Sequence, residues 1–477
     1  MNNNLSNASL QWVLDELHPA SACGRELLRD LRPGGPGDQE SIERELDDVQ
    51  RLAGADAVQW RQIARLAHAF SLVKDLRRTF VRCREVALGE VELFEVKRFL
   101  MQVGRIAPQA AQLAGDLGVS GAELDPCTGA LQLLDVDGQG TAAFSVSSRY
   151  SKELAAVRQE KRQIEDEIRR TGAVSDDLQV RRTAVLAREQ REEEAVCLRL
   201  SQELQPSLNA MEEDLRRIAR LDLLIEKARL ARTWGAVRPQ LGGSVLRLTG
   251  MFDPYVVQTL RQSGGEFTPV DIELRRGPTV ITGANMGGKS VALRAVVLNA
   301  LLAHMGFFVF AQQAEVPLFD EIILIAEDGQ SVQQGLSSFG AEITALDNAL
   351  TRCRGRFCLL VLDEFARGTN PEEGRRIVSA LVRYLSDKNS IALLATHYDG
   401  AARHAAAHYQ VAGLRDVDPA ALKREIEAGG GFQAIRRHMD YRLLPAGAFD
   451  ECPRSALTIC RLLLTQKDLI EVIEEGY

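Results

Sequence analysis

The chain has 477 residues, of which 45% are hydrophobic and 26% are charged. This composition excludes a disordered or fibrous chain and is typical of a globular protein with about two to four domains. The first residues lack the basic start and apolar stretch of a signal peptide, and no segment approaches the ~20 apolar residues that span a membrane, so we expect a cytoplasmic protein. The cysteines form no CxxC pair, which argues against a zinc ribbon or a disulfide framework.

Residues 1–147 are predicted to form an N-terminal helical core with a small hairpin. Between about 5 and 115, apolar residues recur at three- and four-residue spacing, and a Pro/Gly-rich loop at 32–37 interrupts them. Residues 130–146 have the pattern of two short strands around Asp137-Gly138, because Asp-Gly tolerates the positive φ angles of tight hairpins.

A long charged helical stretch follows, and residues 148–205 are predicted to form an antiparallel coiled-coil arm. Leu154, Val157, Ile164 and Ile168 have heptad-like spacing, and a second helical run begins near residue 178. Residues 151–240 contain 18 Lys/Arg and 17 Asp/Glu, a net charge of +1 in a chain whose formal net charge is −8. This mixture of signs favours a solvated structural arm over a phosphate-binding surface, because nucleic-acid binding depends on basic contacts to phosphates.

After a returning core helix at 206–245, the pattern changes to that of an α/β domain. The apolar runs 279–281, 359–362 and 391–394 alternate with helical stretches, as buried parallel strands do. The predicted fold class is therefore mixed, with an all-α N-terminal core and arm followed by an α/β domain at 246–477.

A phosphate-binding loop of the pattern GxxxxGK[ST] follows the first of these strands and opens a helix. Its residues are Gly283, Ala284, Asn285, Met286, Gly287, Gly288, Lys289 and Ser290. The glycines would let backbone N–H groups approach phosphates, Lys289 would bring its ammonium to the β- and γ-phosphates, and Ser290 would offer its hydroxyl to Mg²⁺. The alternative is a loop that matches the pattern by chance, but both of its flanks favour ATP binding.

Two further strand ends carry polar residues that suit ATP hydrolysis. Asp363 and Glu364 end a hydrophobic strand about 75 residues after the phosphate loop, where Asp363 would hold the Mg²⁺ shell and Glu364 would polarise the attacking water. His397 ends another apolar strand, where an imidazole could sense the γ-phosphate. The structural alternatives are that the two acids cap the next helix and that the histidine belongs to the core.

The stretches ITGANMGGKS, LLVLDEFARGTNPEEG and LLATHYDG, in this order and spacing, resemble the ATPase domain of the MutS proteins. The intervening AHMGFFVFAQQAEVPLFDEI and QGLSSFGAEI also fit, so the resemblance runs from about residue 267 to 400. It implies that residues 246–477 form an ABC-class P-loop ATPase domain with a C-terminal dimerisation extension, and that the protein works as a homodimer. Each ATP would be sandwiched between the phosphate loop of one subunit and a signature segment of the other.

The resemblance also implies roles for individual residues at the dimer interface. The trans signature would consist of Ser337, Ser338, Phe339 and Glu342. Ser337 would contact the γ-phosphate bound by the partner subunit. The interface loop would contain Arg367, Gly368 and Thr369.

Within one subunit, the resemblance assigns Asn285 to sensing the γ-phosphate and Phe267 to stacking on the adenine. A core position is the alternative for Phe267, because most buried Phe residues serve packing alone. Ala284 stands where many family members have Pro, which changes the stiffness of the loop and leaves its ligand groups intact.

The flanking stretches LLDVDGQGTAAFSVSSRYSKEL and MDYRLLPAGAFDECPRSALTICRLL resemble the ATPase-subunit family of the lysine 5,6-aminomutase reactivases. This resemblance implies an ATP-driven remodeller of a protein client, the aminomutase, acting with a companion protein subunit. No Phe before residue 240 is followed by Glu two positions later, so the mismatch-reading wedge of DNA-binding relatives is not expected. The alternative is a variant that clamps mismatched or branched DNA with its arm. A non-hydrolysing relative is disfavoured, because every residue of the hydrolytic set is present.

The resemblance to MutS proteins also predicts a mechanism. ATP binding would close the two ATPase domains of the dimer, and the helix at 206–245 would carry the shift to the arm. The grip on a client would then depend on the nucleotide state.

Overall fold

The computed structural model describes residues 8–172, 175–283, 288–326, 338–414, 417–426, 431–447, 450, 466 and 469. These residues form two compact units, neither of which is continuous in sequence. The sheet unit comprises residues up to 17, residues 32–50 and the chain from 229 onward, and the helical unit comprises 18–31 and 51–228. The predicted mixed fold is confirmed, since one unit is helical in its described residues and the other contains both sheets.

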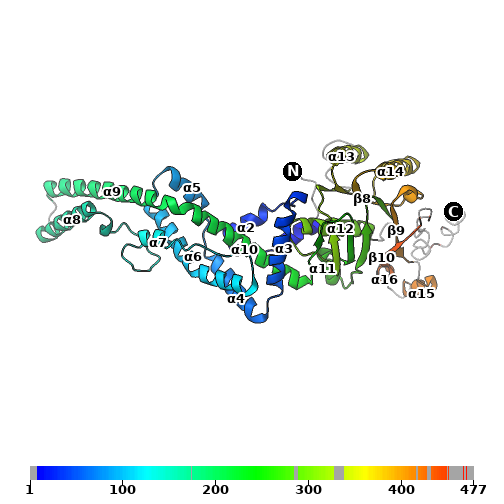
Figure 1. The fold of residues 1–477 in the computed structure, drawn as a ribbon, viewed down its shortest axis with the longest axis horizontal. Coiled ribbons are helices and arrows are strands. Elements are labelled where there is room, and N and C mark those ends of the chain that lie inside the picture. Colours follow the sequence, from blue (N-terminus) through cyan, green and yellow to red (C-terminus); the bar gives the residue numbers. More distant parts are fainter. Residues whose placement is uncertain are drawn as a thin grey trace. The chain divides into compact units, whose positions relative to one another are not determined.

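The helical unit is shown in blue to green in Figure 1. Its helices are α2 (Ala22–Arg29), α4 (Ala57–Ser71), α5 (Arg77–Glu85), α6 (Glu90–Leu117), α7 (Thr128–Leu134), α8 (Lys152–Thr171), α9 (Asp176–Leu204) and most of α10 (Leu208–Trp234). No helix among the described residues is long and apolar enough to cross a membrane.

Serine caps define where the two long helices α8 and α9 begin. The side chain of Ser151 accepts a hydrogen bond from the backbone N–H of Leu154, and that of Ser175 accepts one from Leu178. Gly172 ends α8 in the left-handed region at φ 63°. Each serine cap satisfies a backbone N–H donor that the first turn of a helix leaves without an intrahelical partner.

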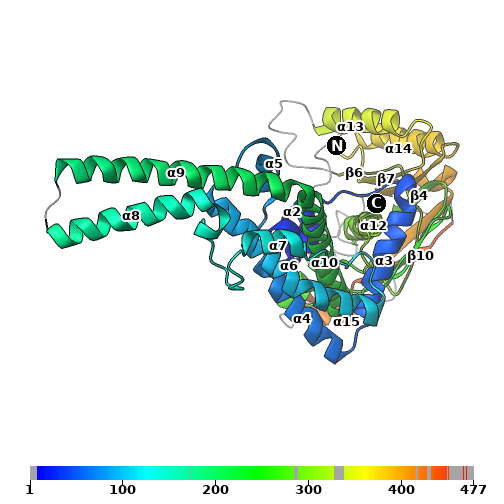
Figure 2. The same cartoon turned by 60° about the vertical axis from the view of Figure 1, so that its left-hand side comes forward.

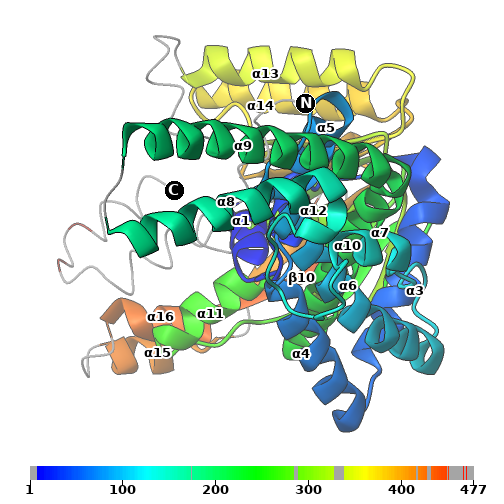
Figure 3. The same ribbon diagram turned by 90° about the vertical axis from the view of Figure 1, so that its left-hand side faces the viewer.

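Helices α8 and α9 lie side by side and run in opposite directions (Figures 2 and 3). Val157 and Ile164 of α8 are buried with Val185 of α9, and Ile168 packs against them. Three of the four predicted heptad positions, Val157, Ile164 and Ile168, therefore form the apolar seam between the helices, because residues at heptad spacing return to the same helix face.

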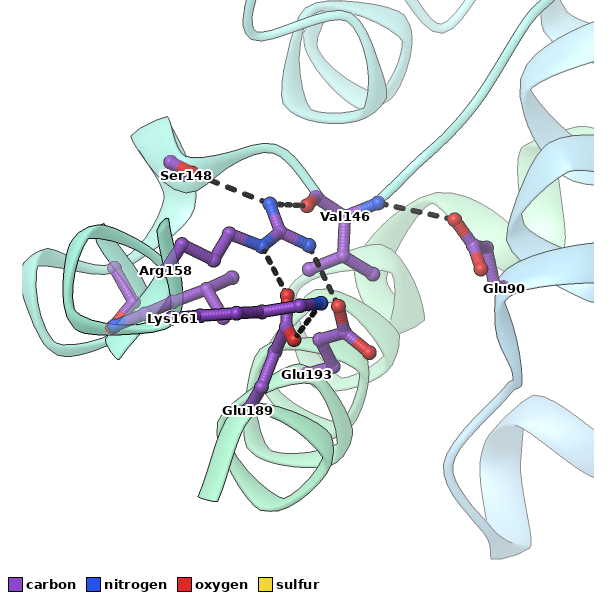
Figure 4. A network of polar contacts seen from close by, with 9 residues as sticks. Glu90, Val146, Ser148, Arg158, Lys161, Glu189 and Glu193 are labelled. Carbon is purple, nitrogen blue, oxygen red and sulfur yellow. Dashed lines mark hydrogen bonds and ion pairs between the residues drawn. The ribbon is translucent and has the colours of Figure 1, made fainter. Parts of the chain in front are cut away.

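A network of ion pairs surrounds Arg158 near the start of α8 (Figure 4). Its guanidinium donates to Glu189 Oε1 at 3.0 Å, to Glu193 Oε1 at 2.6 Å and to the carbonyl of Val146 at 2.6 Å. Lys161 forms an ion pair with the second oxygen of Glu189. Burial alone would raise the pKa of Glu189, but hydrogen bonds from Lys161 and Arg158 outweigh burial and lower that pKa. Arg158 and Lys161 are thus both paired with acids of α9.

The hairpin predicted at 130–146 is wrong. Its first half lies in helix α7, and no strand is assigned to the described residues between α7 and α8. The turn at Asp137-Gly138 is present. The segment after it is held by a side chain and not by a second strand, because the buried Lys97 ammonium donates to Asp135 Oδ1 and to the Ala143 carbonyl, both at 2.8 Å. The sequence pattern identified the turn, while a lysine of α6 holds the segment after it.

Asp214 of α10 is a buried acid inside the helical unit. Its side chain is 1% exposed, Oδ1 accepts a hydrogen bond from the backbone N–H of Asp125, and Oδ2 has no hydrogen-bond partner among the described residues. Burial, as the largest cause, raises the pKa of Asp214 to about 6. A carboxyl group whose pKa is higher in the folded state stabilises the fold most at low pH, and this contribution is lost as the pH rises through about 6.

We therefore expect Asp214→Asn to raise the melting temperature at pH 8 and to change it little at pH 4. The gain at pH 8 corresponds to roughly 2 kcal/mol, because each pKa unit is worth about 1.4 kcal/mol and relaxation reduces the full shift. Calorimetry across this pH range measures the effect, with Asp177→Asn on the exposed start of α9 as the control. An equal gain at both pH values would contradict the assigned titration.

The described residues of the sheet unit form two β-sheets. One has four strands in the order β1-β5-β2-β3, and the other has six in the order β10-β9-β4-β8-β7-β6. The strands are β1 (Gln240–Leu241), β2 (Leu246–Met251), β3 (Val270–Leu274), β4 (Gly277–Thr282), β5 (Gln313–Val316), β6 (Glu321–Ile325), β7 (Cys358–Asp363), β8 (Ser390–Thr396), β9 (Ala407–Gly413) and β10 (Asp440–Pro445). Among the described strands of the larger sheet, the β9–β10 pair is antiparallel and the other pairs are parallel. The three predicted apolar runs are the buried central strands β4, β7 and β8.

Helices cover the six-stranded sheet. Those of the sheet unit are α1 (Ala8–Asp15), most of α3 (Gln39–Ala53), α11 (Pro254–Gln262), α12 (Lys289–His304), α13 (Ser338–Arg352), α14 (Pro371–Leu385), α15 (Pro419–Glu425) and α16 (Gly431–His438). Helices α13 and α14 lie next to each other in all three views and share one buried cluster with alternate residues of β7, such as Leu360 and Leu362. Helix α12 packs on β6, β7 and β8 and is buried around most of its circumference.

Polar contacts attach the N-terminal segments to the sheet unit. Ser9 Oγ donates to the buried Asp253 carboxylate at 2.5 Å. Arg238 forms ion pairs with Glu43 at 2.6 Å and with Asp47 at 2.8 Å. These contacts join residues about 190 to 245 positions apart in the chain, so the first fifty residues do not all belong to the helical core that the sequence predicts.

Candidate functional site

The predicted phosphate loop lies between a parallel strand and a buried helix. Strand β4 ends at Thr282 and helix α12 begins at Lys289, which confirms both predicted flanks. Ala284, Asn285, Met286 and Gly287 lie outside the described residues. Gly283 and Gly288 have φ angles of 151° and 80°, and a Cβ on Gly288 would lie 2.9 Å from the Tyr441 ring. Only glycine fits both the backbone and the space at position 288.

Lys289 is buried at the first position of α12. Its side chain is 3% exposed, and its ammonium donates to the Gly283 carbonyl at 2.7 Å. The same ammonium lies 3.5 Å from Glu364 Oε1. A buried cation beside the N-terminus of a helix, where backbone N–H groups and the helix dipole favour anions, provides a strongly positive site for phosphate.

Ser290, the residue after Lys289, contacts Asp363. The Ser290 hydroxyl donates to Asp363 Oδ1 at 2.9 Å, which joins the start of α12 to the end of β7. Burial raises the pKa of Asp363, and the hydrogen bond from Ser290 opposes this shift. A hydroxyl and a carboxylate are hard oxygen ligands that suit Mg²⁺. The described residues contain no group of three or more His, Cys, Asp or Glu that could hold a metal ion.

Glu364 follows Asp363 in a strained conformation. Its φ angle is 48°, in the left-handed region that residues with a Cβ adopt at an energetic cost, and Ala366 has φ 64°. The carboxylate of Glu364 lies between two cations, with Arg367 at 2.9 Å from Oε2 and Lys289 at 3.5 Å from Oε1. The backbone thus turns the acid toward the phosphate loop.

His397 follows strand β8, which is the neighbour of β7 in the sheet. Its Nδ1 is buried and has no hydrogen-bond partner among the described residues. Burial lowers the pKa of His397, although the nearby Glu364 carboxylate opposes the shift. The ring is therefore neutral at pH 7, with a ring nitrogen whose hydrogen-bonding capacity the described protein groups leave unused.

A cavity of about 550 Å³ opens beside these residues. Gly288, Lys289, Ser290 and Glu364 line its polar end. Its apolar wall is formed by Met251, Val256, Leu260, Phe267, Val270, Val291, Ala292 and Ala295, with Tyr441, Thr268 and Glu266 at its edges. The structure thus brings Phe267 into the same cavity as the phosphate loop. Tyr441 was not predicted from the sequence, because strand β10 carries no motif that indicates a ligand.

The signature residues are described only in part. Ser337 and the side chain of Ser338 lie outside the described residues, and α13 begins at residue 338. Phe339 packs against the core cluster shared by α13 and α14. Glu342 uses Oε2 to accept the backbone N–H of Ala366 of the same chain at 2.8 Å.

The predicted interface loop is partly exposed. Arg367 and Gly368 are exposed, and the hydroxyl of Thr369 donates to Glu373 at 3.3 Å. Arg367 thus contacts Glu364 of its own chain, while its role at a dimer interface remains a prediction.

Comparison with known proteins agrees with this geometry. The family model described as MutS domain V matches residues 279–426, which span β4 to α15. The DNA mismatch repair protein MutS of Natronomonas pharaonis is 29% identical over 492 aligned positions, covering 89% of this chain and 56% of that protein.

Two further relatives match a smaller share of the chain at higher identity. The DNA mismatch repair protein MutS of Thermus thermophilus is 36% identical over 208 positions, covering 44% of this chain and 25% of that protein. Endonuclease MutS2 of Caldanaerobacter subterraneus is 31% identical over 215 positions, covering 44% and 26%. The match therefore spans about half the length of the first relative and about a quarter of the other two. The domain V match and these relatives thus show that the chain contains a MutS-type domain V, with the strand-loop-helix geometry at Lys289 inside it, and that the chain is similar to MutS-family proteins.

Proposed function

We propose that this chain binds and hydrolyses ATP in the cavity beside α12. The observation that carries the proposal is the meeting of Lys289, Ser290 and Glu364 at one end of a cavity whose other walls are apolar. A nucleotide has the same division, since its phosphates need cations and backbone N–H groups while its base needs apolar and aromatic contact. The cavity volume of about 550 Å³ lies within the range of small-molecule sites.

Each residue of the site has a separate task in this proposal. Lys289 exchanges its contacts with Gly283 and Glu364 for the β- and γ-phosphates, and Phe267 stacks on the adenine. Ser290 and Asp363 would hold Mg²⁺, which neutralises phosphate charge when it is bound. Glu364, released by Lys289, accepts a proton from the attacking water, and His397 contacts the γ-phosphate.

The active form in this proposal is a homodimer in which each ATP contacts both subunits. The resemblance to the family supports this arrangement, with Ser337 reaching the partner's γ-phosphate and Asn285 acting within its own subunit. The exposed positions of Arg367 and Gly368 beside the site are compatible with contact to a second subunit. ATP binding would thus close the dimer, and hydrolysis would open it.

The client gripped by this clamp is proposed to be a protein, with a companion subunit, and the inactivated lysine 5,6-aminomutase is the candidate that the flanking resemblance names. The supporting observation is the charge pairing of α8 and α9. Besides the Arg158 network, Arg188 forms an ion pair with Glu160 at 2.8 Å and Arg181 with Glu167 at 3.7 Å. Basic groups that are already paired with acids gain less from phosphates than unpaired ones.

DNA is the second candidate client, because the relatives are named as mismatch repair proteins and an endonuclease. Both candidates can be tested by one assay, the ATPase rate of the purified protein with different additions. We expect inactivated aminomutase to stimulate the rate several-fold, and homoduplex, mismatched and branched DNA to leave it unchanged. Stimulation by DNA alone, with affinity that falls steeply with salt, would replace the protein client by DNA.

A further inference from the structure

The turn after β7 contains two left-handed residues within three positions. Glu364 has φ 48° and Ala366 has φ 64°, and both carry a Cβ. Such backbone conformations persist only where neighbouring groups hold them, and they are common at sites where a side chain must be aimed. The direction of the Glu364 carboxylate therefore depends on the contacts that hold this turn.

Two side chains from other elements hold the backbone at Ala366. On one side, Glu342 of α13 accepts its N–H at 2.8 Å. On the other side, the hydroxyl of Tyr398 donates to its carbonyl at 2.9 Å. Tyr398 is only 7% exposed, so water replaces its hydrogen bond poorly.

Helix α14 leaves room for the Tyr398 contact. A Cβ on Gly374 would lie 2.3 Å from the Tyr398 hydroxyl oxygen and 2.9 Å from the Ala366 carbonyl oxygen. Glycine at this position thus allows the hydroxyl to reach the turn. Tyr398 also directly follows His397, and the centroids of the two rings lie 4.4 Å apart.

We propose that Tyr398 is a positioning residue for Glu364, acting through the Ala366 carbonyl to hold the strained turn that aims the carboxylate at the attacking water. This inference rests on the proposed ATPase function. Glu342 accepts the N–H of the same residue, so the two peptide groups that flank the Ala366 Cα are held from the signature helix α13 and from the segment after β8. Removal of the Tyr398 hydroxyl would leave the ATP-binding groups in place and loosen only the acid.

The test is Tyr398→Phe, which removes one oxygen atom and keeps the ring. We expect kcat for ATP hydrolysis to fall about fivefold, the value of one net hydrogen bond, with KM unchanged. Binding of a fluorescent ATP analogue should also be unchanged. Tyr384→Phe on the exposed face of α14 is the matched control and should retain the full rate.

A second background separates positioning from a general loss of stability. In a Glu364→Gln protein the aimed carboxylate is absent, so adding Tyr398→Phe should cause no further fall in the residual rate. Gly374→Ala, whose new Cβ would displace the hydroxyl, should lower kcat in the wild-type background as well.

Full activity of Tyr398→Phe, or an equal loss in both backgrounds, would overturn the positioning role while leaving the ATPase proposal intact. Wild-type protein that binds ATP but does not hydrolyse it, alone or with any client, would instead overturn the ATPase proposal and the positioning role with it.

Discussion

Glu364→Gln is expected to lower the rate of ATP hydrolysis by about 10²–10⁴-fold, the usual contribution of a positioned general base. The amide cannot accept the proton of the attacking water, yet it keeps the size of the side chain and an oxygen that can accept from Arg367 and Lys289. ATP binding should therefore persist, and the ATP-bound closed dimer should accumulate. Steady-state phosphate release and sedimentation velocity with and without ATP measure the two effects.

The control for this experiment is Glu203→Gln, an exposed acid on α9 that forms an ion pair with Arg199 at 3.7 Å. It should retain both the wild-type rate and the wild-type oligomeric response to ATP. If Glu364→Gln loses hydrolysis but stays monomeric with ATP, the sandwich arrangement does not apply to this protein. If it hydrolyses ATP normally, another group must activate the water.

Lys289→Ala is expected to weaken ATP binding by about 10- to 100-fold, because a charge-assisted hydrogen bond to phosphate contributes about 1.5–3 kcal/mol. The ammonium is buried and lies between the Gly283 carbonyl and Glu364, so its loss also leaves a buried carbonyl without this donor. Titration with a fluorescent ATP analogue measures the affinity, and the melting temperature without nucleotide reports any loss of stability.

Lys388→Ala is the matched control, because this lysine is exposed and follows the C-terminal end of α14, away from the site. Its ammonium lies over the Tyr384 ring. It should bind ATP as the wild type does. Equal affinities of Lys289→Ala and wild type would remove the phosphate loop from the proposed site, even if the rest of the cavity bound another ligand.

Much of the candidate site could be predicted from the sequence, because its residues follow buried parallel strands. Such strands appear as continuous apolar runs, and their carboxyl ends meet at one edge of the sheet. The neighbours β7 and β8 accordingly place Glu364 and His397 close enough for the acid to affect the pKa of the imidazole. Ser290 meets Asp363 although 73 positions separate them.

The rest of the site could not be predicted, because it depends on single side chains that fill space or complete hydrogen bonds. Tyr441 reaches the cavity from β10, and a tyrosine in a short strand has no pattern that distinguishes a ligand contact from ordinary packing. The hydrogen bond from Tyr398 to Ala366 depends on the strained turn, which sequence periodicity does not report. The hairpin failed for a related reason, since Lys97 supplies contacts that a second strand was expected to make.

The discontinuity of the sheet unit has a consequence for synthesis of the chain. Residues 8–17 and 32–50 emerge from the ribosome about 190 to 245 residues before their partners, such as Asp253 and Arg238. At about 5–20 residues per second, these segments wait for tens of seconds before their partners exist. The sheet unit therefore cannot complete its fold from residues 229 onward alone, and a fragment starting at residue 229 would need residues 8–17 and 32–50 supplied separately.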